Sequence, residues 1–197
     1  MKVRVSALPQ KPRNLPGYHA PGAGFEAPFE MLAACHERVE RMLTLIVKLQ
    51  QHLQQKGFDD SAAQAARDVM RYFDLAAPLH HEDEERHVFP ALMAGPDASI
   101  KALVLRLIQD HRQMGVAWVG AKAVLQVVAD ASPASWRPLT AWQSAALNGF
   151  AGLYRQHLDD EDQLVYPAAQ VQLTETALAA MGEDMMQRRG VKPTGPV

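Results

Sequence analysis

The sequence predicts an all-α protein: an antiparallel, up-down four-helix bundle with a Pro/Gly-rich N-terminal arm and a short C-terminal helix. Ala, Leu, Gln, Glu and Met dominate from Pro28 onward, and the alternation of apolar and polar residues that marks strands is scarce. Turn-forming residues divide this stretch into long segments. Each long segment carries apolar residues at steps of three and four, as helices do when they pack in a bundle.

The chain is long enough for one domain with a sizeable core, since 48% of its 197 residues are hydrophobic. Residues 1–24 are rich in proline and glycine, which disfavours a long helix or a central strand, and we expect an extended arm there. Residues 25–172 form the predicted bundle, and residues 173–197 form the C-terminal helix and tail.

Turn residues set the bounds of the first two helices. The first is expected from about residue 28 to residue 56, with Pro28 in the first turn, where a missing N–H is tolerated, and Gly57 after the end. The second is expected from about residue 61 to residue 94, before Gly95. Pro78 lies inside this second helix and predicts a kink or a local break near residues 75–77.

The remaining helices follow in the same way. The third is expected from about residue 97 to residue 129, with Asp97 as its N-cap. The fourth begins near Pro133 or Pro138 and runs to about residue 171. A shorter amphipathic helix is expected from residue 174 to residue 189, before Gly190. Its methionines indicate a packed face or the contact of a homodimer.

The composition excludes several classes of protein. A formal net charge of −2 argues against a nucleic-acid partner, because such proteins normally carry a strong basic excess. A single cysteine, Cys35, excludes a disulfide framework or a thiolate metal cluster within one chain. The apolar runs are too short to span a membrane, and no apolar secretory stretch is visible. We therefore expect a cytoplasmic protein without a membrane partner.

An internal repeat is the most informative feature of the sequence. Residues 80–90 (HHEDEERHVFP) and 157–167 (HLDDEDQLVYP) align without a gap as His-x-x-x-Glu, four residues, then an aromatic residue and proline. A second pair in the first copy, His81 and Glu85, has the same His-x-x-x-Glu spacing. This pair does not keep the distance to the aromatic-Pro pair, so we take His80 with Glu84 as the equivalent of the second copy.

This spacing has a chemical meaning, because residues four apart lie on one face of a helix and can converge on one site. The other two long helices each place one histidine on their apolar seam. Imidazole and carboxylate together suit iron, manganese, zinc or cobalt, whereas burying such groups without a cation is costly. The predicted metal ligands are His36, His80, Glu84, His111, His157 and Glu161.

The order of these groups over residues 28–172 resembles the hemerythrin-like, HHE cation-binding family. The resemblance implies a di-iron centre without haem, with an oxo or hydroxo bridge and with zinc or manganese as possible substitutes. It further implies a protein that binds or senses a small ligand such as O2, peroxide or NO. By the same resemblance, one iron is held by His36 and His80 and the other by His111 and His157, with Glu84 and Glu161 as bridges.

The sequence departs from the oxygen-carrying members of that family at one position. Those proteins have a further histidine one turn after the ligand in the third helix, where this chain has Gly115. One iron should therefore have fewer protein ligands and more open positions, which disfavours stable oxygen carriage. His81, Glu85 and His87 are the candidates to replace the missing ligand or to orient the others.

Other functions remain open at this point. A di-iron oxidase or peroxide-handling enzyme of the ferritin type needs Glu-x-x-His twice, but only Glu84 and His87 fit, because Leu164 follows Glu161. Iron–sulfur repair proteins carry a cysteine in an N-terminal segment, and none precedes Cys35 here. Iron storage or handling is a further alternative. A helical interaction protein without metal leaves the repeat unexplained.

Overall fold

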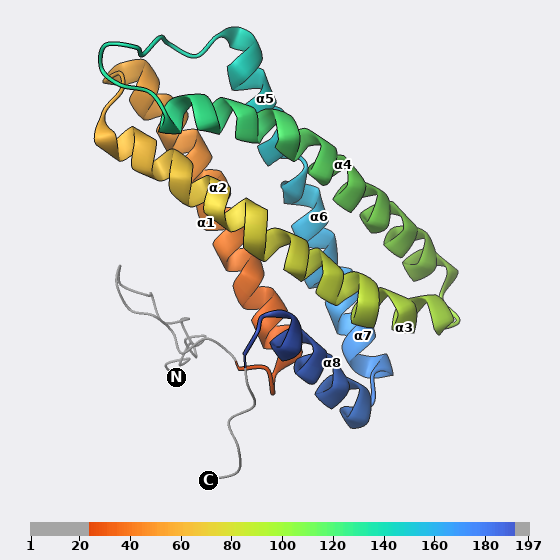
Figure 1. The fold of residues 1–197 in the computed structure, drawn as a ribbon. Helices are drawn as coiled ribbons and strands as arrows, with labels where there is room; N and C mark the ends of the chain where they lie inside the picture. The colour runs from red at the N-terminus through yellow and green to blue at the C-terminus, as the bar shows by residue number, and fades with distance from the viewer. Residues whose placement is uncertain (1–23, 192–197) are drawn as a thin grey trace, which may run out of the picture.

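The computed structural model describes residues 24–191, and within this range the regular secondary structure is helical (Figure 1). The all-α prediction is therefore confirmed for these residues. The arm predicted for residues 1–24 lies, except for Gly24, outside the described range. Among the described helices, none contains a window long and apolar enough to cross a membrane.

Two of the long helical rods contain π-helical segments, which are labelled η. The first half of the chain comprises α1 (Pro28–Gln55), α2 (Asp60–Asp83), η1 (Glu84–Val88), α3 (Phe89–Ala94) and α4 (Ala98–Ala129). The second half comprises α5 (Ala141–Gly152), α6 (Tyr154–Asp160), η2 (Glu161–Val165), α7 (Tyr166–Gln172) and α8 (Glu175–Arg188). The segments α2, η1 and α3 follow one another directly in one rod, and α6, η2 and α7 do the same in another.

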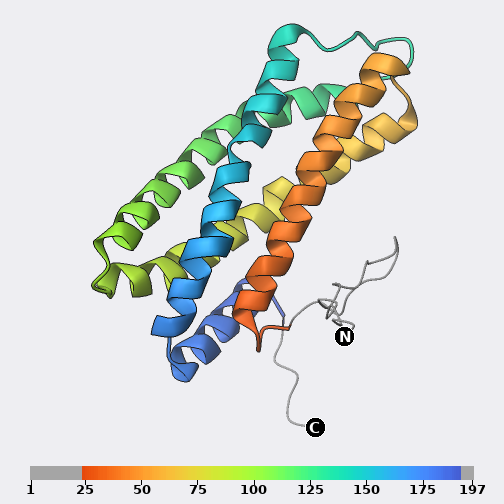
Figure 2. The same cartoon turned by 180° about the vertical axis from the view of Figure 1, so that it is seen from behind.

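The long rods lie side by side, as both views show (Figure 1, Figure 2). α1 packs on α2, α2 on α4, α4 on α5, and α5 returns to α1, so the contacts close a ring. A helical bundle of this kind has one central interior, and side chains that point inward from all of the rods can meet there.

The helix ends follow the turn chemistry of the sequence. Asp97 accepts hydrogen bonds from the backbone N–H groups of the first turn of α4, as predicted. Gly57 and Gly190 both have a positive φ, which explains why the preceding helices end there.

The predicted local break near residues 75–77 is wrong, because α2 runs as one α-helix through Pro78. The departure from α-helical geometry comes instead at η1.

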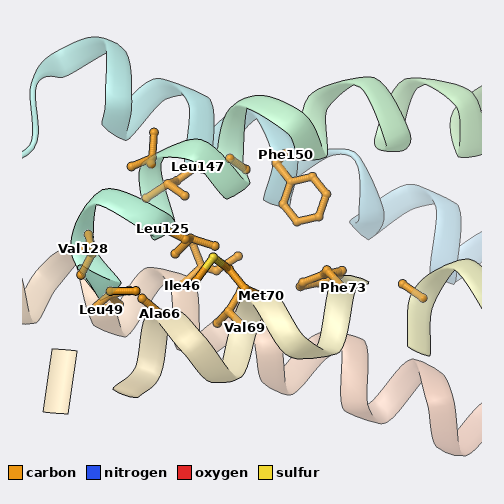
Figure 3. Close-up of a cluster of buried hydrophobic side chains, with 14 of the residues drawn as sticks. Ile46, Leu49, Ala66, Val69, Met70, Phe73, Leu125, Val128, Leu147 and Phe150 are labelled. Carbon is orange, nitrogen blue, oxygen red and sulfur yellow. The ribbon is translucent and has the colours of Figure 1, made fainter. Parts of the chain in front are cut away.

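The apolar interior is divided into two clusters. The cluster shown in Figure 3 contains, among others, Ile46, Phe73, Leu125, Leu147 and Phe150. The second cluster contains, among others, Leu32, Phe89, Leu107, Tyr166 and Met185. Along every rod the predicted ligands lie between residues of the first cluster and residues of the second. The polar groups are therefore sealed from water on both sides by hydrocarbon.

The short helix α8 packs against the ends of α1 and α2. Met181 and Met185 are fully buried in the second cluster, so this methionine face contacts the chain's own interior. Gly182 makes the close approach possible, because a Cβ at this position would come within 2.0 Å of the carbonyl oxygen of Phe25. α8 thus covers the end of the bundle nearer the polar centre.

Candidate metal centre

The repeated motif produces the same local structure twice. In each copy an α-helix becomes a π-helix at the glutamate, and the N–H groups of Phe89 and Tyr166 bond to the carbonyls of Glu84 and Glu161, five residues back. A proline follows each aromatic residue, and its ring cannot accept the α-helical arrangement with the carbonyl four residues back. The π turn brings residue i+5 to the face of residue i. The spacing of four and then five residues therefore puts histidine, glutamate and aromatic ring on one inner face.

The first half of the centre is formed by His36 of α1 and His80 of α2. Their Nε2 atoms lie 3.0 Å apart. Both residues are buried, and together with Glu84 and Glu161 they offer ligand atoms that all lie within 4.8 Å of one another. The described residues therefore contain one compact group of two imidazoles and two carboxylates.

The second half of the centre is formed by three histidines. Two of them, His111 and His157, are among the six ligands predicted from the sequence. The Nε2 atoms of His111 and His157 lie 3.2 Å apart. His81 joins them, with its ring stacked on that of His111 at a centroid distance of 3.9 Å. His81 was one of three candidates to replace the ligand lost at Gly115, and the structure places it beside the other two imidazoles.

The two carboxylates span both halves. Glu84 places Oε1 3.5 Å from Nε2 of His80 and Oε2 3.5 Å from Nε2 of His111. Glu161 places Oε2 3.3 Å from Nε2 of His36 and Oε1 3.1 Å from Nε2 of His157. Each glutamate thus directs one oxygen to each histidine group, which is the arrangement of a carboxylate that bridges two cations.

Two carboxylates outside the cluster fix the orientation of imidazole rings. Nδ1 of His36 donates to Asp162, and Nδ1 of His111 donates to Glu85, both at 2.8 Å. A carboxylate accepts such a bond and leaves Nε2 directed inward, as is usual for metal-bound histidine. Asp162 and Glu85 are the residues that follow Glu161 and Glu84 in the repeat. From the sequence, the charged run around Asp162 favours a solvated face; its side chain is indeed partly exposed, but it also bonds to a predicted ligand.

The two central carboxyl groups differ in pKa. Burial, and next the negative charge of Glu161, raise the pKa of Glu84 well above its ordinary range. Burial alone would also raise the pKa of Glu161, but His111, His157 and His36 hold it well below its ordinary range. Between these two carboxyl groups a proton is therefore held more firmly by Glu84 than by Glu161. Two like charges this close need cations before both can ionise.

The histidines are also perturbed. Burial alone would lower the pKa of His36, but the hydrogen bond to Asp162 and the proximity of Glu161 raise it to about 9. Burial, and next the charge of His36, hold the pKa of His80 well below its ordinary value. Burial and the charge of His111 do the same for His81. Neutral imidazoles are the form that binds metal.

The donor atoms present fit a pair of cations. Ligand atoms about 2.0–2.2 Å from one ion and at right angles to each other are roughly 3.0 Å apart, close to the spacing between the paired Nε2 atoms. Three carboxylate oxygens, Oε2 of Glu84 and both oxygens of Glu161, are buried without a hydrogen-bond partner. Such orphaned atoms are costly in a protein interior, and cations would satisfy them.

Comparison with known proteins identifies the family. The family model described as the hemerythrin HHE cation binding domain matches residues 27–169. The chain belongs to the hemerythrin HHE cation-binding family. A similar curated protein, an uncharacterized protein of Haemophilus influenzae, is 38% identical over 71 residues, which are 36% of this chain and 41% of that protein. The chain thus covers less than half the length of this relative.

Other residues considered from the sequence lie away from this HHE centre. Gly115 is exposed, and a Cβ added there would meet no atom within 4 Å, so this position faces away from the cluster. His87 bonds to Asp184 of α8 at 2.8 Å instead of turning inward. The Glu84–His87 pair therefore does not form the Glu-x-x-His arrangement of a ferritin-type site.

Metal affinity in this HHE centre should rise with pH. A cation must displace the proton of His36, whose pKa is about 9, so each pH unit below that value should weaken the apparent affinity about tenfold per displaced proton. The proton of Glu84 acts in the same direction. Zinc titrations against a competing chelator, from neutral pH to about pH 9, measure the slope.

Replacing Asp162 by Asn tests whether the carboxylate of Asp162 causes the raised pKa of His36 and, with it, the pH dependence of metal affinity. Without this carboxylate the pKa of His36 should fall, and the rise in affinity should move to lower pH. The exposed Asp159 on the same rod serves as control, and Asp159→Asn should leave the profile unchanged. An affinity that is constant over the whole interval would refute the assigned protonation state of His36.

Proposed function

We propose that the chain holds two iron ions between its two histidine groups and that this centre binds or senses a small ligand such as O2, peroxide or NO. The observation that carries the proposal is the pair of buried glutamates, each of which directs one oxygen to each group. The ligands we assign are His36, His80, His81, Glu84, His111, His157 and Glu161.

Two cations suit the charges better than one. A single divalent ion in one half would leave the other imidazoles and the far carboxylate oxygens without a partner in a site closed by hydrocarbon. Two ions would satisfy both halves, and the two carboxylates would offset part of their charge. Nitrogen and oxygen donors without thiolate suit iron, with zinc or manganese as substitutes.

Iron would supply open coordination positions and one-electron chemistry for a small ligand. The protein's own contribution is to hold the donors before the metal arrives. Asp162 and Glu85 orient two of the imidazoles, and the two apolar clusters keep bulk water away. A peroxide-handling enzyme uses the same centre, and the reaction with peroxide distinguishes it from a carrier or sensor.

Metal content and spectrum test the proposal. The full chain, purified without added metal, should contain close to two irons, and its visible and near-ultraviolet spectrum should change when O2, azide, peroxide or NO is added. His52 lies outside the cluster and pairs with Asp59, so His52→Ala should keep both ions. A protein that takes up neither iron, zinc nor manganese would show that the bundle serves another purpose. Consumption of peroxide over many turnovers would favour the enzymatic alternative.

A further inference from the structure

The two copies of the repeat are chemically unequal at one position. Phe89 and Tyr166 are equivalent in the alignment, and each ring stacks on the lone imidazole of a neighbouring helix. Phe89 lies 5.7 Å from His111 with an interplanar angle of 25°, and Tyr166 lies 5.2 Å from His36 with an angle of 22°. The rings therefore pack alike, but a hydroxyl group is present only beside the His36 half.

The Tyr166 hydroxyl lies within the group of predicted ligands. It donates a hydrogen bond to Oε1 of Glu84 and lies 2.9 Å from Nε2 of His36. The side chain is buried in the second apolar cluster, and the hydroxyl has no hydrogen-bond partner other than these two among the described residues. A buried phenolic hydroxyl needs a polar partner, and here both partners are predicted metal ligands.

The number of potential metal ligands in each half of the centre indicates the role of the Tyr166 hydroxyl. The His111 half has three imidazoles of its own, because His81 joins His111 and His157. The His36 half has only two, and Tyr166 occupies the place where a third donor would lie. Its distance of 2.9 Å from Nε2 of His36 matches the roughly 3.0 Å expected between neighbouring ligands of one ion. With Tyr166 counted, each half has three donors of its own and shares the two glutamates.

We propose that the phenolic oxygen of Tyr166 is a ligand of the metal ion held by His36 and His80, and of that ion only. This inference rests on the proposed function. Coordination exchanges the O–H bond of Tyr166 for an oxygen–metal bond, and the proton leaves to solvent. Glu84, which loses its hydrogen bond in the exchange, gains the same ion as its partner.

The two positions then differ in the cation they prefer. The His36 half offers two imidazoles, a phenolate and two carboxylate oxygens, whereas the second half offers three imidazoles with the carboxylates. Hard oxygen donors with more negative charge favour the more highly charged ion, and a nitrogen-rich set suits a divalent one. The chain would therefore hold ferric iron more firmly in the His36 half.

Tyr166→Phe tests the proposal, and it is expected to fold because phenylalanine fills the equivalent position in the other copy. The full chain is loaded with iron and oxidised. The parent protein should show a visible phenolate-to-iron charge-transfer band with the resonance Raman modes of a coordinated phenolate, and the variant should lack both. Zinc titration should show one of the two binding steps weakened by more than about tenfold, the scale of changes around metal ligands.

Tyr72→Phe is the matched control. Its hydroxyl donates to the carbonyl of Cys35, outside the cluster, so this variant should keep the band and both zinc affinities. An iron-loaded parent without the phenolate signature, or a Tyr166→Phe variant with unchanged zinc affinities, would refute the assignment of Tyr166 while leaving the metal centre intact. A parent protein that binds no metal would refute the proposed function itself, and this inference with it.

Discussion

Replacing Glu161 by Ala is expected to remove metal from both halves of the centre. Its two oxygens lie 3.3 Å from Nε2 of His36 and 3.1 Å from Nε2 of His157, so the change takes one ligand from each ion. It also removes the charge that holds two cations together in a buried site. We expect each affinity to fall more than about 100-fold, because changes outside the ligand set alone cost roughly 10–100-fold. Iron analysis and zinc titration measure the loss.

Two comparisons make this expectation specific. His81→Ala removes a donor from one histidine group only, so the variant should retain close to one ion in place of two. Asp159 is exposed on the same rod, and Asp159→Ala should retain both ions. If Glu161→Ala keeps two ions with unchanged affinity, the carboxylate does not bridge. If His81→Ala loses all metal and His80→Ala loses none, the wrong one of two adjacent histidines was assigned from the repeat.

The sequence was sufficient for those features that depend on helical periodicity. The bounds of α1 and α4 follow from Pro28, Gly57 and Asp97, whose effects are local. The six predicted ligands meet at the centre because each lies on an apolar seam, and seams face the common interior of a bundle. Their role as ligands stays a prediction. To bring these six side chains together, helical periodicity and the packing of the long helices in a ring are sufficient.

Other features depended on departures from that periodicity. The π segments turn Tyr166 inward, and a strict 3.6-residue repeat does not place it on the face of His157 and Glu161. His81 lies one residue off the seam and reaches the cluster by stacking on His111, a contact that only the packing of α2 on α4 creates. The sequence could propose His81 among several candidates, but tertiary packing was needed to choose it.

The last helix contributes a contact that no motif predicted. Asp83, the residue before Glu84, is completely buried and bonds to Arg188, the last residue of α8, and to Arg189, which follows it. A buried carboxylate needs such partners, and here they come from a segment about a hundred residues later in the chain. α8 therefore stabilises the rod at the point where it becomes π-helical, next to a predicted metal ligand.

Removing both arginines is expected to be strongly destabilising. Arg188→Ala with Arg189→Ala leaves Asp83 charged and without partners inside the protein, and losing one side of a buried ion pair costs about 3–5 kcal/mol. Urea unfolding of the metal-free protein measures the change in the free energy of unfolding. Zinc affinity should fall as well, because the backbone of Asp83 leads directly into Glu84.

The control is Arg86→Ala, since Arg86 is half exposed and pairs with Glu82 and Asp184 at the surface. This change should cost less than about 1 kcal/mol, the range of exposed ion pairs. Adding Asp83→Asn to the double arginine variant should recover part of the loss, because it removes the charge that the arginines had compensated. Equal stability of the arginine variant and the Arg86 control would mean that water reaches Asp83 when α8 is altered. The helix would then be a cover for the apolar cluster alone, and its arginines would have no part in holding the metal centre.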